Sequence, residues 1–178
     1  MSAFIYLASQ SPRRSQLLTQ IGVEHQLLLP DPHEDAEALE AVHGREAPAR
    51  YVQRVTALKL DAAVARLKAQ TLPAAPVLCA DTTVALGRDI LGKPTDAAEA
   101  RAMLARLSGT RHRVLTAVAV QFGRRRVSAL SQSWVRFAPM SAAHIRAYAD
   151  SGEPMGKAGA YAVQGRAAAH IEQVSGSY

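Results

Sequence analysis

The stretch Val77–Val84, which reads VLCADTTV, is the strongest indication of the fold. Its first four residues, Val77–Ala80, form an unbroken apolar run, a pattern typical of a short strand buried on both faces of a sheet. Because Asp81 follows this run directly, we expect the strand to end there, with the carboxylate at the carboxyl end of a central strand. Open α/β sheets bind their ligands at that edge.

Helical and extended patterns alternate around this strand, which predicts a mixed α/β fold with a central sheet and flanking helices. Upstream, we expect a strand at Phe4–Ala8, a helix from Ser11 and Pro12 to just before Gly22, a loop or short helix at Asp31–Glu40, and a long helix at about Pro48–Lys68. Downstream, we expect a helix from Asp96 to Ser108, a hairpin of Val114–Phe122 and Val127–Phe137 around Gly123, a helix capped by Ser141 that ends near Gly152, and a strand near Ala168–Val174.

Length and composition bound the class of protein. The 178 residues suit one domain, or two small lobes around a cleft. The apolar runs are far shorter than the roughly 20 residues that cross a bilayer, and the N-terminus lacks a cationic stretch ahead of its apolar residues, so we expect neither a membrane span nor a secretory signal. Cys79 is the only cysteine, which fits a reducing compartment, and we therefore expect a cytoplasmic protein.

The basic balance of the chain leaves nucleic acid open as a partner. The formal net charge is +6, which suits a polyanion. Arg124–Arg126 follow Gly123 at the expected hairpin tip, however, where a solvated turn explains them more simply than a nucleic-acid contact. With 5% aromatic residues and no nucleic-acid-binding motif, a specific nucleic-acid partner is not expected, and a small anion such as a nucleotide is the simpler ligand.

Hydroxyl and guanidinium groups gather at one expected helix N-terminus, where Ser9, Ser11, Arg13 and Arg14 lie close together in the sequence. Cations at this end oppose the helix dipole by about 0.3–1 kcal/mol each, so two arginines need a reason. A bound phosphate chain would supply one, because N–H groups, hydroxyls and guanidinium groups all bind phosphate oxygens. Two solvated arginines explain the spacing equally well.

Carboxylates in two places are candidates for catalysis or metal binding. Asp81 either is catalytic or caps the turn after its strand, and catalysis is favoured because a charge at the end of an apolar strand is costly to bury without a cation. Glu34, with its neighbours Asp31 and Asp35, would add a second carboxylate for a hard cation such as Mg²⁺. A solvated acidic loop explains Glu34 equally well.

Three lysines are candidates for phosphate binding. Lys59 falls inside the apolar stripe of the long helix, with Val52 and Val55, so it must snorkel, pair or serve a site. Lys93 and Lys157 occupy glycine-containing loops, where each would neutralise a phosphate. The histidines show no metal-ligand spacing, and the sequence contains neither a nucleophile elbow nor a Walker A loop.

Six segments, taken in order, resemble the Maf family of nucleotide pyrophosphatases over essentially the whole chain. They are Leu7–Leu18 (LASQSPRRSQLL), Ala80–Val84 (ADTTV), Leu91–Pro94 (LGKP), Leu107–Gly109 (LSG), Thr116–Val118 (TAV) and Lys157–Gly165 (KAGAYAVQG). The resemblance implies a mixed sheet in two lobes around a deep nucleotide cleft, related to inosine triphosphatase-like proteins, with dependence on Mg²⁺ or Mn²⁺ and often a homodimer. It also leads us to expect that the family's C-terminal tail is missing after Tyr178.

The resemblance also assigns roles to residues. It matches the family's catalytic acid to Asp81 and its phosphate-binding groups to Ser9, Ser11, Arg13 and Arg14. The remaining site residues of the family match Glu34, Lys59, Thr82, Lys93 and Gln164. With Glu34 and Asp81 as the expected metal ligands, Asp81 would act as the general base or would orient a water for attack on the α-phosphorus.

The motifs resemble one branch of the family more than another. Ser-Pro-Arg-Arg, Ala-Asp-Thr and Gln164 are similar to the branch that acts on dTTP and UTP, whereas the 7-methyl-GTP branch would have tryptophan after the proline, Asp-Gln at positions 81 and 82, and Glu at position 164. The implied reaction converts the nucleoside triphosphate to the monophosphate and diphosphate, with modified pyrimidine nucleotides left open as substrates. The alternative is a non-enzymatic regulator of cell division that binds nucleotide or nucleic acid.

Overall fold

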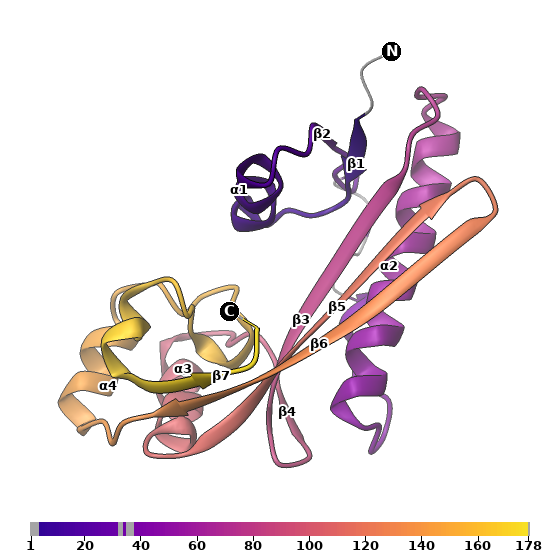
Figure 1. Cartoon of the computed structure of the whole chain (residues 1–178). Coiled ribbons are helices and arrows are strands. Elements are labelled where there is room, and N and C mark those ends of the chain that lie inside the picture. The colour runs from indigo at the N-terminus through magenta and orange to yellow at the C-terminus, as the bar shows by residue number, and fades with distance from the viewer. Residues whose placement is uncertain (1–3, 32–33, 35–37, 178) are drawn as a thin grey trace. The chain divides into compact units, whose positions relative to one another are not determined.

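The computed structural model describes residues 4–31, 34 and 38–177, which form helices and strands of a mixed α/β fold (Figure 1). The helices are α1 (Pro12–Gln20), α2 (Pro48–Ala69), α3 (Ala97–Leu107) and α4 (Ala142–Ala149), with 3₁₀ helices η1 (Ala38–Glu40), η2 (Ala158–Ala160) and η3 (Arg166–His170). The strands are β1 (Ile5–Leu7), β2 (His25–Leu27), β3 (Val77–Leu86), β4 (Asp89–Leu91), β5 (Arg111–Phe122), β6 (Arg125–Phe137) and β7 (Ile171–Ser175).

The strands lie in one sheet in the order β2-β1-β3-β5-β6-β7, with β4 paired to β3. β1 is parallel to β2 and to β3, whereas β4 is antiparallel to β3 and β7 is antiparallel to β6. The mixed central sheet predicted from the sequence is therefore confirmed. The chain divides into two compact units: unit 1 comprises Met1–Asp81 and Ala117–Leu130, and unit 2 comprises Thr82–Thr116 and Ser131–Tyr178.

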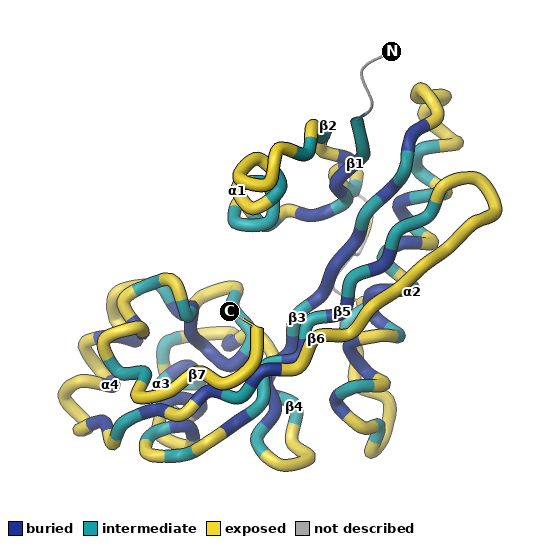
Figure 2. Tube along the Cα trace, viewed as in Figure 1, coloured by how far each residue is buried: buried dark blue, intermediate teal, exposed yellow. Residues whose placement is uncertain are grey.

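Unit 1 packs helix α2 against β1 and the first part of β3. Leu60 and Ala63 of α2 share a core cluster with Tyr6 of β1 and with Val77 and Cys79 of β3. Burial raises the pKa of the Cys79 thiol to about 12, so this side chain behaves as a small apolar residue in the core. β3 is buried or half-buried along its whole length, as expected for a central strand (Figure 2).

Helix α1 ends where its sequence predicts. Gly22 has φ 73, and its N–H donates to the Thr19 carbonyl while the Val23 N–H donates to the Leu18 carbonyl. These two bonds are the Schellman pattern, which uses a glycine because its missing Cβ removes the steric cost of positive φ. The turn directs the chain back into β2, parallel to β1.

Unit 2 packs α3 and α4 around its own core. The Asp96 side chain accepts a hydrogen bond from the Glu99 N–H at the start of α3, and Ser141 accepts one from the His144 N–H at the start of α4, as their positions in the sequence predict. The core of unit 2 contains Leu104 of α3, Ile145 and Tyr148 of α4, Phe137 of β6 and Tyr161. The hairpin predicted around Gly123 is also confirmed, as β5 and β6.

Asp81 does not end its strand, contrary to the expectation from the sequence. β3 continues through Asp81 to Leu86, because Thr82, Thr83 and Val84 are β-branched and favour extended backbone. A cation on α2 also makes it possible to bury the carboxylate inside the strand, as described below. The neighbouring strand does end here: Leu7, the last residue of β1, pairs with Leu78, so Asp81 still lies beyond the carboxyl end of β1.

Two strands, β2 and β4, were not predicted from the sequence, and β7 begins later than expected. β2 and β4 have three residues each, too few to establish a periodic pattern. β7 begins at Ile171 rather than near Ala168, because Arg166–His170 forms η3.

Candidate active site

Asp81 is a buried carboxylate held by a lysine from α2. Its residue is only 8% exposed, and Oδ1 lies 2.6 Å from Nζ of Lys59. The same Nζ lies 2.7 Å from Oε1 of Glu40, at the end of η1. One ammonium group thus bridges two carboxylates within unit 1.

Lys59 reaches this position because of its phase on α2. Val52, Val55 and Leu60 are buried on the helix face that packs against the core, and Lys59 extends from the edge of that face toward β3. Lys59 is therefore paired, which is one of the options that the sequence leaves open, and its role in a site stays a prediction. The interaction draws β3, α2 and η1 together around charged atoms rather than around apolar ones.

Glu40 is a candidate site residue that sequence reasoning missed. The Tyr51 hydroxyl of α2 donates to the Glu40 carbonyl at 2.9 Å, and Arg54 donates to the next carbonyl, that of Ala41, at 2.8 Å. These bonds fix the end of η1 against α2 and so place the Glu40 carboxylate. The only signal in the sequence was the acidic character of Asp31–Glu40, which does not single out one carboxylate.

The charged side chains of Asp81, Lys59 and Glu40 influence one another's pKa values. Burial raises the pKa of Asp81 above its ordinary value, although the positive charge of Lys59 opposes the shift. Burial by itself would lower the pKa of Lys59, but the charges and hydrogen bonds of Asp81 and Glu40 outweigh it, and the pKa is raised. Lys59 therefore stays an ammonium ion, while Asp81 becomes a stronger base than an exposed aspartate.

The segment before α1 gathers the predicted phosphate-binding groups. The Ser9 hydroxyl, in a residue 8% exposed, accepts hydrogen bonds from Nη1 of Arg14 at 3.0 Å and from the Ser11 N–H at 3.2 Å. Ser11 occupies the N-cap of α1, but its side chain makes no capping hydrogen bond. Burial lowers the pKa of Arg14, against the opposing effect of the Asp81 charge and reinforced by the like charge of Arg13. Arg14 and Asp81 are thus close enough to interact electrostatically.

Glu34, the second predicted metal ligand, binds an arginine. Its carboxylate accepts hydrogen bonds from Nε of Arg66 at 2.8 Å and from Nη2 at 2.5 Å, and one oxygen also accepts the Asp31 N–H at 3.3 Å. The hydrogen bonds from Arg66 lower the pKa of Glu34. Asp35, its predicted partner, lies outside the described residues. A metal role for Glu34 stays a prediction.

The donor set at Asp81 fits a hard divalent cation. Asp81 and Glu40 supply carboxylate oxygens that already share one positively charged atom, and Mg²⁺ and Mn²⁺ prefer such oxygens together with several waters. Among residues 4–31, 34 and 38–177, no group of three or more His, Cys, Asp or Glu side chains is arranged to hold a metal ion. A cation here would therefore need ligands from water or substrate.

The other predicted substrate contacts belong to unit 2. The Thr82 hydroxyl lies 2.9 Å from that of Thr116, so adjacent strands β3 and β5 present a pair of hydroxyls. Lys93 is exposed next to Gly92, and Gln164 is exposed in the segment that follows η2. The Lys157 ammonium, by contrast, donates to the carbonyls of Glu153 and Met155.

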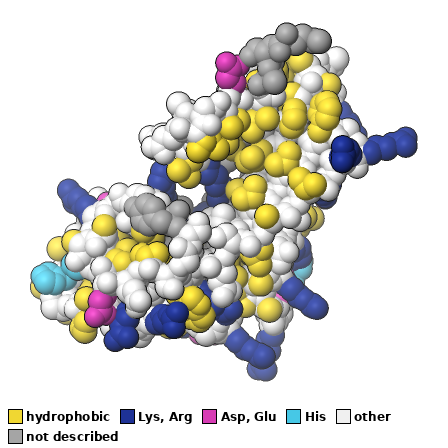
Figure 3. Space-filling view, in the orientation of Figure 1, with side chains coloured by type: hydrophobic (Ala, Val, Ile, Leu, Met, Phe, Trp, Pro, Cys, Tyr) yellow, Lys and Arg dark blue, Asp and Glu magenta, His cyan; other side chains and the backbone are white. Residues whose placement is uncertain are grey.

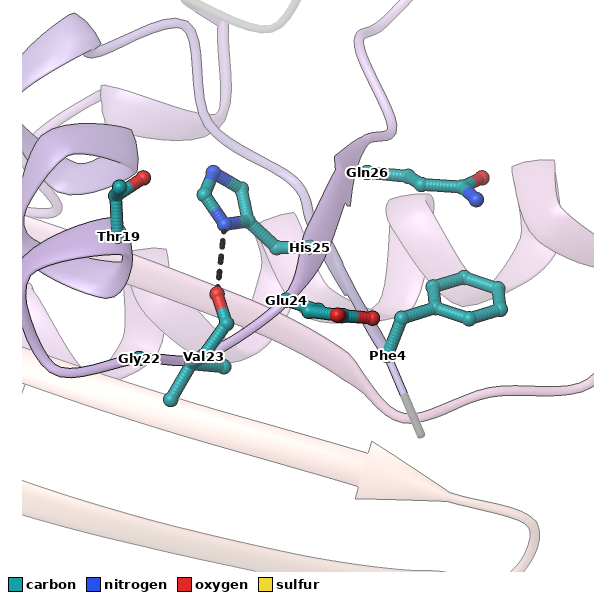
Figure 4. A pocket seen from close by; sticks show the side chains of 7 residues that line it. All are labelled: Phe4, Thr19, Gly22, Val23, Glu24, His25 and Gln26. Atoms are coloured by element: carbon teal, nitrogen blue, oxygen red, sulfur yellow. Dashed lines mark hydrogen bonds between the residues drawn. The ribbon is translucent and has the colours of Figure 1, made fainter. Parts of the chain in front are cut away.

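A pocket on unit 1 does not coincide with these residues. It is lined by the residue before β1, by α1, by β2 and by the turn between them, namely Phe4, Thr19, Gly22, Val23, Glu24, His25 and Gln26 (Figure 4). His25 is held there between the Ser15 hydroxyl, 2.7 Å from Nε2, and the Val23 carbonyl, 3.1 Å from Nδ1. The residues in which chemistry is expected are instead those around Asp81.

The basic side chains are spread over the surface of the protein (Figure 3). The face drawn in Figure 3 carries Lys and Arg side chains at several separate places rather than in one patch. Arg126, from the hairpin tip, is bound to Asp61 and Gln121.

In the part of the chain that the structure describes, every helix is too short or too polar to span a bilayer.

Comparison with known proteins gives close relatives over the whole chain. The family described as Maf-like protein matches residues 4–178. The dTTP/UTP pyrophosphatase of Albidiferax ferrireducens is 70% identical over 178 residues, covering 100% of this chain and 89% of that protein. Those of Polaromonas sp. and Cupriavidus metallidurans are 69% and 60% identical, covering 98% and 100% of this chain and 87% and 89% of those proteins.

Among solved structures, a nucleoside-triphosphatase / dITP/XTP pyrophosphatase from Mycobacterium abscessus aligns with 76% of this chain and 75% of its own, with a TM-score of 0.47 and 19% identity. A likeness at this level carries no information on the substrate.

Proposed function

This chain belongs to the Maf family, and we propose that it is a nucleoside triphosphate pyrophosphatase that hydrolyses dTTP and UTP to the nucleoside monophosphate and diphosphate. The observation that carries the proposal is the buried Asp81 carboxylate, whose pKa is raised by burial and which is held in place by the Lys59 ammonium. Relatives that are 60–70% identical over 87–89% of their length and are named dTTP/UTP pyrophosphatases support the choice of substrate.

Asp81 is the proposed general base. A carboxylate whose pKa is raised accepts a proton from water more readily near neutral pH, and the water then attacks the α-phosphorus. Diphosphate leaves, and the Asp81 proton is released to solvent. Lys59 holds the carboxylate in place and keeps its positive charge, which stabilises negative charge on phosphate oxygens.

The groups at the start of α1 are the proposed phosphate contacts. Ser9, Ser11, Arg13 and Arg14 combine hydroxyls, guanidinium groups and the positive end of a helix dipole, all of which favour an anion. Such contacts act chiefly by stabilising the charge that builds up during phosphoryl transfer. Thr82, Lys93 and Gln164 are proposed as further substrate contacts on the strength of the family motifs.

A divalent cation is the proposed cofactor, held by Asp81 and Glu40. When bound, it would polarise a phosphate oxygen and lower the pKa of a bound water. Glu40 replaces Glu34 in this proposal because Glu40 shares Lys59 with Asp81, whereas Glu34 is engaged by Arg66. Treatment with EDTA should abolish turnover, and Mg²⁺ or Mn²⁺ should restore it. Full activity after exhaustive chelation would remove the cofactor from the proposal.

The decisive experiment is a panel of nucleoside triphosphates with resolved products. Cleavage between the α and β phosphates gives monophosphate and diphosphate, whereas a phosphatase releases orthophosphate. dTTP and UTP should be the best substrates. Cytosine should be disfavoured because its edge reverses the donor and acceptor pattern of uracil, which leaves polar groups unpaired at about 1–3 kcal/mol each.

Two results of this panel would contradict the proposal in different ways. Preference for a purine triphosphate would overturn the substrate while leaving the reaction class intact. Release of no diphosphate from any common or methylated nucleotide would overturn the enzyme itself and favour a binding role.

A further inference from the structure

A buried histidine in unit 2 has no part in the proposed chemistry. His112 of β5 is 0% exposed, and its Nε2 lies 2.7 Å from the hydroxyl of Tyr161. Its ring packs edge-on against those of Phe137 and Tyr161, with centroids 5.4 Å apart in both pairs. The other ring nitrogen, Nδ1, makes no hydrogen bond of good geometry among the described residues, although an interaction with the Thr110 backbone partly opposes the lowering of the ring's pKa. A buried polar side chain whose hydrogen bonds are incomplete stabilises the core less than an apolar side chain of similar size. The hydrogen bond between His112 and Tyr161 therefore needs an explanation other than stability.

The histidine's partner lies in the segment that carries Gln164. Tyr161 directly follows η2, and Gln164 comes three residues later. Within η2, the Gly159 N–H donates to the Gly92 carbonyl at 2.9 Å, beside Lys93. The segment from residue 158 to 164 is therefore tied to the Lys93 loop at one point and, through Tyr161, to β5 at another.

The backbone of this segment needs such support. Ala160 has φ 60, in the left-handed region that residues other than glycine rarely adopt and that persists only when the surroundings hold it. Gly159 has φ 68 and packs so closely that a Cβ would lie 2.8 Å from the Val84 side chain. On the far side of Gln164, the Glu153 carboxylate accepts the Arg166 N–H at 3.1 Å. Gln164 thus stands between two anchored points.

A fixed orientation matters for an amide that reads a base. A glutamine side chain presents one acceptor and two donors, and rotation by half a turn exchanges them. A freely turning amide would match the edge of cytosine as well as that of uracil, so it discriminates between them only when its orientation is held.

We propose that His112 and Tyr161 are positioning residues for base selection, which hold the segment 158–164 so that the Gln164 amide meets the base in a single orientation. The inference rests on the proposed function, in which Gln164 contacts the substrate. The pair acts through Gln164 and touches no reacting atom.

Matched variants separate this role from simple packing. Tyr161→Phe keeps the ring and removes the hydroxyl, and His112→Leu removes the ring nitrogen. His112→Gln keeps a polar nitrogen near the position of Nε2 and serves as the conservative rescue. Phe137→Leu is the packing control, because Phe137 contacts both rings but has no polar atom. The measurements are kcat and KM for UTP and CTP, and amide hydrogen exchange over residues 158–165.

Tyr161→Phe and His112→Leu should each lower the preference for UTP over CTP by about tenfold, which is the effect of one hydrogen bond. The change should come mainly from a higher kcat/KM for CTP. The kcat for UTP should change less than about twofold. Exchange in the segment 158–165 should accelerate in both. His112→Gln should recover most of the preference, and Phe137→Leu should lose stability without losing preference.

An unchanged preference in Tyr161→Phe and His112→Leu, or an equal loss in Phe137→Leu, would overturn the inference. Gln164→Ala distinguishes this failure from failure of the proposed function. If Gln164→Ala loses the preference while Tyr161→Phe keeps it, the positioning role is wrong and the proposed substrate contact stands. If wild-type enzyme does not prefer UTP to CTP, the proposed substrate is wrong and the inference falls with it.

Discussion

Unit 1 and unit 2 each bury a small set of titratable side chains, but they keep them in different states. In unit 1, Lys59 lies within 2.7 Å of a carboxylate oxygen on each of Asp81 and Glu40, and its pKa is raised by them. In unit 2, burial lowers the pKa of His112 to about 4 and raises that of Tyr161, so both rings are neutral at physiological pH. One cluster is built from charges and the other from neutral hydrogen-bonding groups.

The charged cluster of unit 1 suits a role in the reaction, whereas the neutral pair of unit 2 suits a role in positioning. Charges are costly to remove from water, and a buried ion pair is a weak source of stability compared with apolar packing of the same volume. A cluster such as Asp81, Lys59 and Glu40 is therefore better explained by a reaction that uses its charges than by folding. Neutral groups such as His112 and Tyr161 are cheaper to bury and fix geometry through one directed bond.

The largest expected effect comes from removing the charge of the proposed base. Asp81→Asn keeps the shape of the side chain, and Lys59 keeps Glu40 as its partner, so the fold should persist. Turnover of dTTP and UTP should fall by about a hundredfold or more, the usual contribution of a general base or metal ligand. Steady-state kinetics, with circular dichroism as the check on folding, measure the effect. Turnover close to that of wild type would make the assignment of Asp81 wrong.

The neutral cluster predicts a pH dependence of stability. The folded pKa of His112 is about 4, below the unfolded value of about 6.5, so the unfolded chain binds the proton more tightly. The free energy of unfolding is therefore unaffected by this histidine above pH 6.5. It decreases as the pH falls from 6.5 to 4, by up to about 3 kcal/mol, because the buried ring resists protonation. Urea unfolding of wild type and His112→Gln from pH 7 to 4.5 isolates this contribution. Parallel pH profiles for the two proteins would show that His112 does not titrate as described.

A smaller effect distinguishes the two glutamates of the acidic segment. Glu40→Gln removes one of the two charges that Lys59 bridges, and we expect turnover to fall by about tenfold. Glu34→Gln removes the charge of a side chain that is 37% exposed but leaves an amide oxygen to accept from Arg66, whose side chain is 8% exposed, so activity should change less than about twofold. The same kinetic and unfolding assays apply to both. A larger loss of turnover in Glu34→Gln than in Glu40→Gln would favour Glu34 as the metal ligand and make the choice of Glu40 wrong.

Local signals account for what could be predicted from the sequence. The capping side chains of Asp96 and Ser141 mark the starts of α3 and α4, and Gly123 marks the hairpin, because each acts on its own neighbours in the chain. Even Lys59 was identified as unusual from helical phase alone, since a cation inside an apolar stripe needs a partner. The family motifs added the candidate residues of the site, whose roles stay a proposal.

Contacts between distant segments were beyond the sequence, because they depend on how the elements pack. Whether Glu34 or Glu40 meets Lys59 depends on how the end of η1 docks on α2, since both belong to one acidic stretch. The continuation of β3 through Asp81 depends on a cation from α2, since a buried charge would otherwise favour ending the strand. The bond between His112 and Tyr161 joins residues 49 positions apart, a separation at which no periodic pattern in the sequence reports proximity.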